Sequence, residues 1–125
     1  MARTAVSYTP FVPNGHLTDV AGTTIDATLV TNGVVINNAD PERTLIRVAN
    51  TAGTSKVVTV KTGTGGQSWM AGQGDSATTV AATTGVEWLG PFTSARFQQQ
   101  GSKVYVDFAS GTTGTITVFK LPKAF

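Results

Sequence analysis

The residue types that carry out most enzyme chemistry are scarce in this sequence. Among 125 residues there are seven acidic residues, one histidine and no cysteine. A serine hydrolase triad would need His16, but this residue follows a Pro-Asn-Gly turn, which is a poor place for a catalytic base held by packing. Asp40 and Glu42 flank a proline, which is ordinary turn chemistry. We therefore expect no enzymatic activity, no catalytic residue, no bound metal and no cofactor.

Trp69 and Met70 are the residues most suited to contact a partner. They lie in the glycine-rich segment 62–76. Such a tryptophan can fold back to cap one end of the fold, can anchor a protein partner, or can stack on a sugar ring, because tryptophan and methionine are enriched where partners dock. The sequence alone leaves these three alternatives open. Trp88 alternates with Val86 in an apolar run, and we expect it to be buried in the core.

The composition is that of a single β domain. Threonine occurs 22 times and glycine 14 times, while charged residues make up only 13%. β-branched side chains fit a pleated sheet, and glycine marks the turns between strands. A chain of this length supports one hydrophobic core. We therefore predict an all-β, single-domain antiparallel β-sandwich, with a small barrel as the alternative.

Short β-prone runs recur along the chain at the spacing typical of such folds. They cover residues 4–8, 28–30, 34–36, 44–50, 56–61, 77–82, 86–92, 95–98, 103–108 and 115–121. The Asn32-Gly33 pair predicts a hairpin between the second and third runs. The glycine loop 51–55 predicts a hairpin between runs 44–50 and 56–61, and the last three runs resemble an antiparallel meander. Residues 93–99 are the best candidate for a helix, of barely two turns.

The first 24 residues differ from the remainder. Pro10 and Pro13 lack the amide hydrogen that a central strand needs, so we divide the chain into residues 1–24, an extended N-terminal arm, and residues 25–125, the β-sandwich domain. The apolar side chains of Phe11, Val12 and Leu17 would gain nothing in solvent. We therefore expect the arm to contribute to binding more than to folding.

Strand alternation predicts an apolar outer face near the C-terminus. Val104, Val106 and Phe108 would face the core, which leaves Tyr105 outside, while Phe119 and Leu121 share the outer face of the last strand. If these two strands are neighbours, Tyr105 and Phe119 form an exposed aromatic pair that favours association. The alternative is that the N-terminal arm of the same chain covers both residues.

Charge and hydropathy argue against nucleic acid and membrane partners. The formal charge is +2, and the nine basic residues are scattered singly, so they cannot neutralise several phosphates together. No run of 18 apolar residues exists, and the N-terminus lacks the apolar core of a secretory signal. We expect a soluble protein whose whole chain is mature.

Several ordered features resemble the head decoration (cement) proteins of tailed actinobacteriophages. These features are the run TLIRVANTAGTSKVVTVKTG, a glycine-rich loop, the run TTGVEWLGPFTSARFQQQGSKVYVDF, and the terminal GTTGTITVFKLPKAF. The similarity covers most of the chain after about Asp26. It lies in the pattern of a WLGPF turn, a strand, a glycine and a strand that ends in VDF.

The resemblance implies a jelly-roll-like sandwich that acts as a structural component of a virion. Its partner would be the major capsid protein on the outside of the shell, after synthesis in the host cytoplasm, and self-association as a trimer is favoured over a monomer or dimer. Two alternatives are a carbohydrate-binding module that uses Trp69 as its platform and a tail or fibre component. The predicted partner interface comprises Phe11, Val12, Leu17, Trp69, Met70, Tyr105, Phe119 and Leu121.

Overall fold

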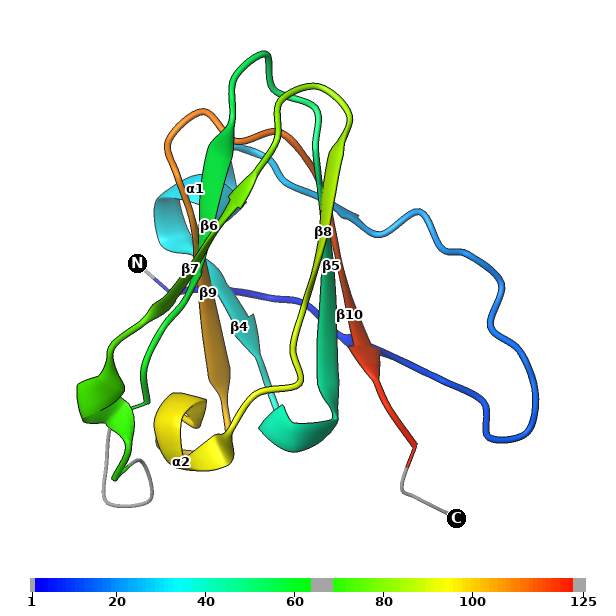
Figure 1. Ribbon diagram of the computed structural model, residues 1–125, viewed down its shortest axis with the longest axis vertical. Helices are drawn as coiled ribbons and strands as arrows, with labels where there is room; N and C mark the ends of the chain where they lie inside the picture. Colours follow the sequence, from blue (N-terminus) through cyan, green and yellow to red (C-terminus); the bar gives the residue numbers. More distant parts are fainter. Residues whose placement is uncertain (1, 64–68, 123–125) are drawn as a thin grey trace.

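Two five-stranded sheets face each other in this protein (Figure 1). The structure is a computed structural model, and it describes residues 2–63 and 69–122. Sheet A has the strand order β1-β4-β9-β6-β7 and sheet B the order β2-β10-β5-β8, with β3 also paired to β10. This arrangement confirms the predicted all-β sandwich. The sheets are not wholly antiparallel as predicted, because β1 pairs with β4 and β2 pairs with β10 in parallel.

The strands are short and the helices occupy the connections. Sheet A contains β1 (Thr4–Ala5), β4 (Val34–Ile36), β9 (Val104–Phe108), β6 (Lys56–Val60) and β7 (Ser76–Val80). Sheet B contains β2 (Tyr8–Pro10), β10 (Gly114–Lys120), β5 (Thr44–Asn50) and β8 (Gly85–Leu89), with β3 (Thr23–Thr24) beside β10. The helices are α1 (Ala27–Asn32) and α2 (Ser94–Phe97), and the 3₁₀ turns are η1 (Pro41–Arg43) and η2 (Ala71–Gln73).

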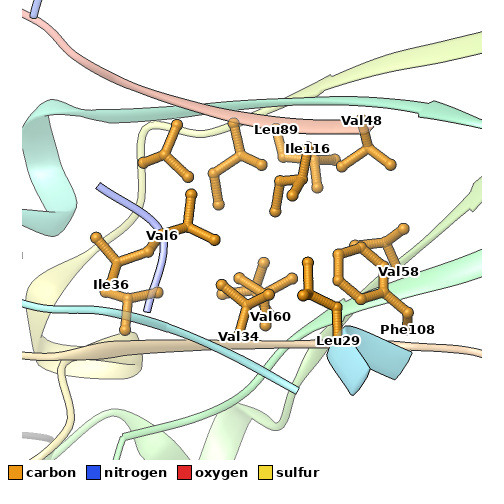
Figure 2. Packing of buried hydrophobic residues seen from close by; sticks show 14 of the residues in the cluster. Val6, Leu29, Val34, Ile36, Val48, Val58, Val60, Leu89, Phe108 and Ile116 are labelled. Atoms are coloured by element: carbon orange, nitrogen blue, oxygen red, sulfur yellow. The ribbon is translucent and has the colours of Figure 1, made fainter. Parts of the chain in front are cut away.

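The core lies between the two sheets and is built mainly from valine and isoleucine. Side chains alternate strictly in β5 and β9, where every second residue is buried, because successive side chains of a strand point to opposite faces. Val104, Val106 and Phe108 are buried, as predicted. Figure 2 shows Val48, Leu89 and Ile116 of sheet B facing Val34, Val58 and Val60 of sheet A.

The first ten residues contribute strands to both sheets. β1 pairs in parallel with β4, and β2 pairs in parallel with β10, so the chain crosses from sheet A to sheet B between them. Val6 lies at this crossing, is 6% exposed, and joins the core between the sheets (Figure 2). The division of the chain at residue 24 stays a prediction, but Val6 has a packing role inside the sandwich.

The hairpin predicted across Asn32-Gly33 is wrong, because its first half is helical. Asp26 caps helix α1 through its side chain, which accepts a hydrogen bond from Leu29 N at 3.0 Å. Gly33 ends the helix with a φ of 79°, a conformation that suits glycine. A side chain at Gly33 would also collide with Arg3 and Asp107. The pair therefore marks a helix C-terminus. The strand predicted at residues 95–98 is also wrong, because helix α2 covers Ser94–Phe97, within the predicted helix candidate 93–99.

The predicted pairing of neighbouring strands is also wrong in two places. β5 and β6 occur where expected, but β5 pairs with β8 and β10 whereas β6 pairs with β7 and β9. β9 and β10 likewise lie in different sheets, so the last strands form no meander. In both cases the connection crosses from one sheet to the other. The prediction failed because a glycine-containing loop can form either a hairpin or a crossing between sheets.

Asn50 ties the two sheets together at the end of β5. This residue is 1% exposed, and its amide nitrogen donates to the carbonyl oxygens of Thr54, Val80 and Ala81 at 3.1–3.3 Å. Its Oδ1 atom accepts from Ala52 N at 2.9 Å. Since buried polar groups must be paired, these bonds fix the crossing loop 51–55 against the end of β7.

We predict that Val6→Ala lowers the free energy of unfolding by about 2 kcal/mol, because it leaves a cavity between the sheets. Urea denaturation followed by far-UV circular dichroism measures the change. Val12→Ala is the matched control, since Val12 is 54% exposed and its truncation should be nearly neutral. Equal effects of the two variants would contradict the placement of Val6 in the core.

Candidate partner-binding surfaces

Residues 11–22 form a projecting loop at the edge of sheet B. Both ends of this loop lie beside the same strand, because Pro10 is in register with Lys120 and Thr23 with Ile116 of β10. Figure 1 shows the loop standing away from the sandwich on the side of sheet B. Surface loops held by a rigid scaffold frequently carry binding residues. The loop carries three predicted interface residues, of which Val12 is 54% exposed, while Phe11 and Leu17 are half-buried.

The base of the projecting loop brings together residues from both ends of the chain. The Phe11 ring packs on Phe119 with 5.2 Å between ring centroids, and Phe11 N donates to Lys120 O at 3.0 Å. Half-buried Leu121 lies in a shallow, largely apolar pocket of about 310 Å³. The pocket is lined by Pro10, Phe11, Pro13, Arg43, Lys120, Leu121 and Pro122. We call Phe11, Val12, Leu17 and Leu121 the loop surface.

Trp88 extends the apolar outer face of sheet B, and its predicted burial in the core is wrong. Its side chain is 53% exposed, and its ring stacks on Phe119 with 5.6 Å between centroids. Val86, on the same face, is 39% exposed. Both faces of the VEWL run carry apolar residues, so alternation alone could not choose the inner face. Leu89 points inward, and Phe11, Phe119 and Trp88 form an aromatic row across the outer face.

Tyr105 and Phe119 do not form the predicted exposed pair, because β9 and β10 belong to different sheets. Residues of the N-terminal arm contact each of them separately. The Arg3 guanidinium lies 4.3 Å from the centre of the Tyr105 ring and pairs with Asp107 at 2.6 Å. Phe119 is only 4% exposed beneath Phe11 and Trp88. The alternative, that the same chain covers both residues, is the one that the structure supports.

Trp69 and Met70 directly precede η2, which contacts α2. Figure 1 shows α2 away from the projecting loop. Trp69 is 78% exposed, which argues against a capping role, whereas Met70 is half-buried. Met70 N donates to Ala95 O at 2.8 Å. Residues 64–68 of the predicted glycine-rich loop lie outside the described residues. The exposed indole remains compatible with both a protein anchor and a sugar platform.

The two stems of the segment that carries Trp69 are held by polar contacts. Asp75 accepts hydrogen bonds from Lys61 Nζ at 2.7 Å and from Thr62 N at 2.8 Å. The bond from Lys61 lowers the pKa of the Asp75 carboxyl, with a further contribution from Thr62 N, and the same bond raises the pKa of Lys61. Arg96 Nε donates to Gly74 O at 2.9 Å, which ties this segment to α2.

Metal and membrane sites are not evident in the part of the chain that the structure describes. Within residues 2–63 and 69–122, no three or more His, Cys, Asp or Glu side chains gather to hold a metal ion. No helix within these ranges has the length and apolar character needed to cross a membrane. His16 is exposed in the projecting loop.

Comparisons with protein-family models, with curated proteins and with solved structures found no match for this chain. The fold and the surfaces therefore define the protein at the level of class. It is an all-β sandwich of two five-stranded sheets with an apolar loop surface at the edge of one sheet.

We predict that Asp75→Asn destabilises the protein by less than about 1 kcal/mol at neutral pH, since the Lys61–Asp75 pair is partly exposed. The folded state lowers the pKa of Asp75, so the carboxylate stabilises the fold above the unfolded pKa of about 4. This stabilisation is lost as pH falls through the folded pKa. The stability difference between wild type and variant, measured by urea titration, should therefore shrink at acid pH.

Asp19→Asn is the control for this comparison, because Asp19 is exposed. Removing this carboxylate should leave the free energy of unfolding at neutral pH nearly unchanged. A constant gap between wild type and Asp75→Asn down to the lowest pH would contradict a role for the ionised carboxylate.

Proposed function

We propose that this protein is a non-enzymatic structural component of a virion that binds the outer surface of a capsid shell and stabilises it. The major capsid protein is its partner, and the capsid exterior is its location. The observation that carries the proposal is the loop surface. Apolar residues from both ends of the chain gather there, beside a loop that stands away from a rigid sandwich.

The loop surface is suited to protein rather than to solvent. Val12, Val86 and Trp88 are exposed apolar side chains on the side of sheet B, and exposed apolar area of this kind marks interaction sites. Arg43 and Lys120 line the pocket at the base of the loop, so an acidic group at the margin of the partner would complement it. Nucleic acid and membrane are not part of the proposal, because the basic residues form no cluster in the sequence.

We further propose that the eight strands β3 to β10 form a jelly roll. In support, β3-β10-β5-β8 make one four-stranded set, and β4-β9-β6-β7 make the other. This is the alternation of two interleaved Greek keys that jelly rolls share, and viral capsid and lectin domains both use it. The fold therefore agrees with the proposed role but does not choose between protein and sugar as the ligand.

The extended arm of residues 1–24 has two parts in this proposal. Residues 4–10 attach the arm to both sheets, and the projecting loop presents Val12 and Leu17 to the shell. Trp69, whose neighbour Met70 is bound to α2, supplies a second contact away from the loop surface. Two separated surfaces let one molecule bridge neighbouring capsid subunits, so that opening the shell must break both contacts. Many copies then add modest interfaces over the whole shell.

We predict that the double variant Val12→Ser, Leu17→Ser binds undecorated shells at least about tenfold more weakly than wild type, because buried anchors of an interface each contribute about 1 kcal/mol or more. Sedimentation of the protein with shells measures the affinity. Circular dichroism should show an unchanged fold, since both residues lie outside the core cluster.

Val57→Ser and Val86→Ser provide a matched comparison for the two faces. Each valine is 39% exposed, but Val57 lies on the outer face of sheet A and Val86 on that of sheet B. Val57→Ser should bind shells as wild type does, whereas Val86→Ser should bind them more weakly. Full binding by the Val12→Ser, Leu17→Ser variant would remove the loop surface from the proposal.

A carbohydrate-binding module is the second candidate, and the exposure of Trp69 favours it. A tail or fibre component would share the fold but not the location. Fluorescence distinguishes capsid binding from sugar binding. In a Trp88→Phe background, undecorated shells should shift Trp69 emission to the blue, because contact with protein removes water from the indole, whereas soluble glycans should leave it unchanged. A shift with a glycan and none with shells would make the sugar-binding module the better proposal.

A further inference from the structure

The N-terminal segment, residues 2–10, is bound to the sandwich much as a separate ligand would be. Arg3 Nη1 pairs with Asp107 and also donates to the carbonyl oxygens of Val34 and Val106. The Tyr8 hydroxyl hydrogen-bonds to Thr44 Oγ1 at 2.6 Å and accepts from Asp40 N at 3.1 Å. All of these partners lie beyond the projecting loop in the sequence.

The backbone of residues 2–10 also contacts the sandwich in the way that a separate peptide ligand would. β1 extends sheet A beside β4, and β2 extends sheet B beside β10, both in parallel. Val6 fills the core between them. Strand pairing and core filling of this kind are equally available to the segment of another copy, because identical chains offer identical edges.

The connection between the segment and the sandwich permits such an exchange. Twelve residues lie between Pro10 and Thr23, and the projecting loop stands away from the sandwich (Figure 1). Extended, these residues span about 40 Å. A domain of this length has a radius of gyration of about 14 Å, so a copy in contact with the first lies within reach.

The returning end of the projecting loop stays on its own sandwich. Gly22 has a φ of 81° and crosses so close to Thr117 that a Cβ atom there would collide with Thr117 Oγ1. Thr23 and Thr24 follow directly and pair with Ile116 and Thr115 of β10. The connection that must rearrange when residues 2–10 move therefore ends at Gly22.

We propose that residues 2–10 are exchanged between copies of this chain, so that the segment of one copy completes the sandwich of the next. The exchanged and closed forms make the same strand and core contacts, so little is lost in the exchange. Since these contacts are equal in the two forms, the additional contact that exchange creates between copies favours the exchanged form, and increasingly so as the protein concentration rises. Exchange around a closed cycle gives a ring, and a ring of three copies would agree with the trimer expected above. The inference concerns the free protein and stands independently of capsid binding.

Engineered disulfides test the exchange directly, because the chain has no cysteine of its own. Ala5 and Val35 are register partners in β1 and β4, so the variant Ala5→Cys, Val35→Cys places two thiols at a separation that a disulfide can bridge. After oxidation of the purified protein, a non-reducing gel and the intact mass show which chains are joined. We expect most chains in covalent oligomers, and the size of the closed species gives the number of copies in the ring.

The variant Thr59→Cys, Ala77→Cys is the matched control. These residues are register partners in β6 and β7, which belong to one hairpin, so the disulfide must form within one chain. A second measurement uses mass action: refolding the Ala5→Cys, Val35→Cys variant at high dilution should raise the fraction joined within one chain.

Three results would overturn the proposal. Monomers in which the two introduced thiols are joined only within one chain, at every concentration, would show that each segment stays in its own sandwich. An oligomer whose chains carry only internal bonds would show association without exchange. Absence of any disulfide, with the control pair fully oxidised, would show that β1 does not pair with β4 in solution.

Discussion

The burial of the two inner sheet faces against each other is the interaction on which the remaining structure depends. Val34, Val48 and Val58, among others, are wholly buried, and they come from strands of both sheets. Because side chains alternate along each strand, the residues on either side of a core residue point to the outer face. The positions of Tyr105, Trp88 and Phe119 are therefore consequences of core packing. The N-terminal segment takes part in the same interaction, since Val6 reaches the core only where the chain crosses between the sheets.

The two outer faces differ in chemistry, so they are suited to different kinds of partner. The outer face of sheet A is polar, with the Arg3–Asp107 ion pair over Tyr105 and the Lys61–Asp75 pair beside it. The outer face of sheet B carries the row of Phe11, Phe119 and Trp88 and the projecting loop. A protein partner that buries apolar area is better matched to sheet B, since polar groups on sheet A already satisfy one another.

Strand β10 is the strand to which both β2 and the returning end of the projecting loop are bound. It is buried on both faces, on the inside by the core and on the outside by Phe11, Trp88 and Gly22. The edge of β10 that does not face β5 pairs with β3 at Thr115 and Ile116 and with β2 from Val118 to Lys120. The projecting loop connects β2 to β3. A single short segment therefore completes an edge, fills a core position and holds the loop that faces the partner. If residues 2–10 come from a neighbouring copy, assembly and the position of the projecting loop are coupled through this strand.

The periodicity of the sequence was sufficient to locate most of the strands. Only the tertiary structure decided which strands are neighbours, and which face of a strand with apolar residues on both faces points inward. β-branched alternation located β5, β6, β7, β9 and β10 to within a few residues, because these signals are local. Phe11, Phe119 and Leu121 lie at one site, which agrees with the alternative that the N-terminal arm covers the last strand, but the order of residues could not show which side chains touch. Trp88 lies outside because Leu89, one residue away, takes the inner position beside Ile46. Such outcomes depend on contacts between residues distant in the chain or on competition between two local signals, and neither is visible in the order of residue types alone.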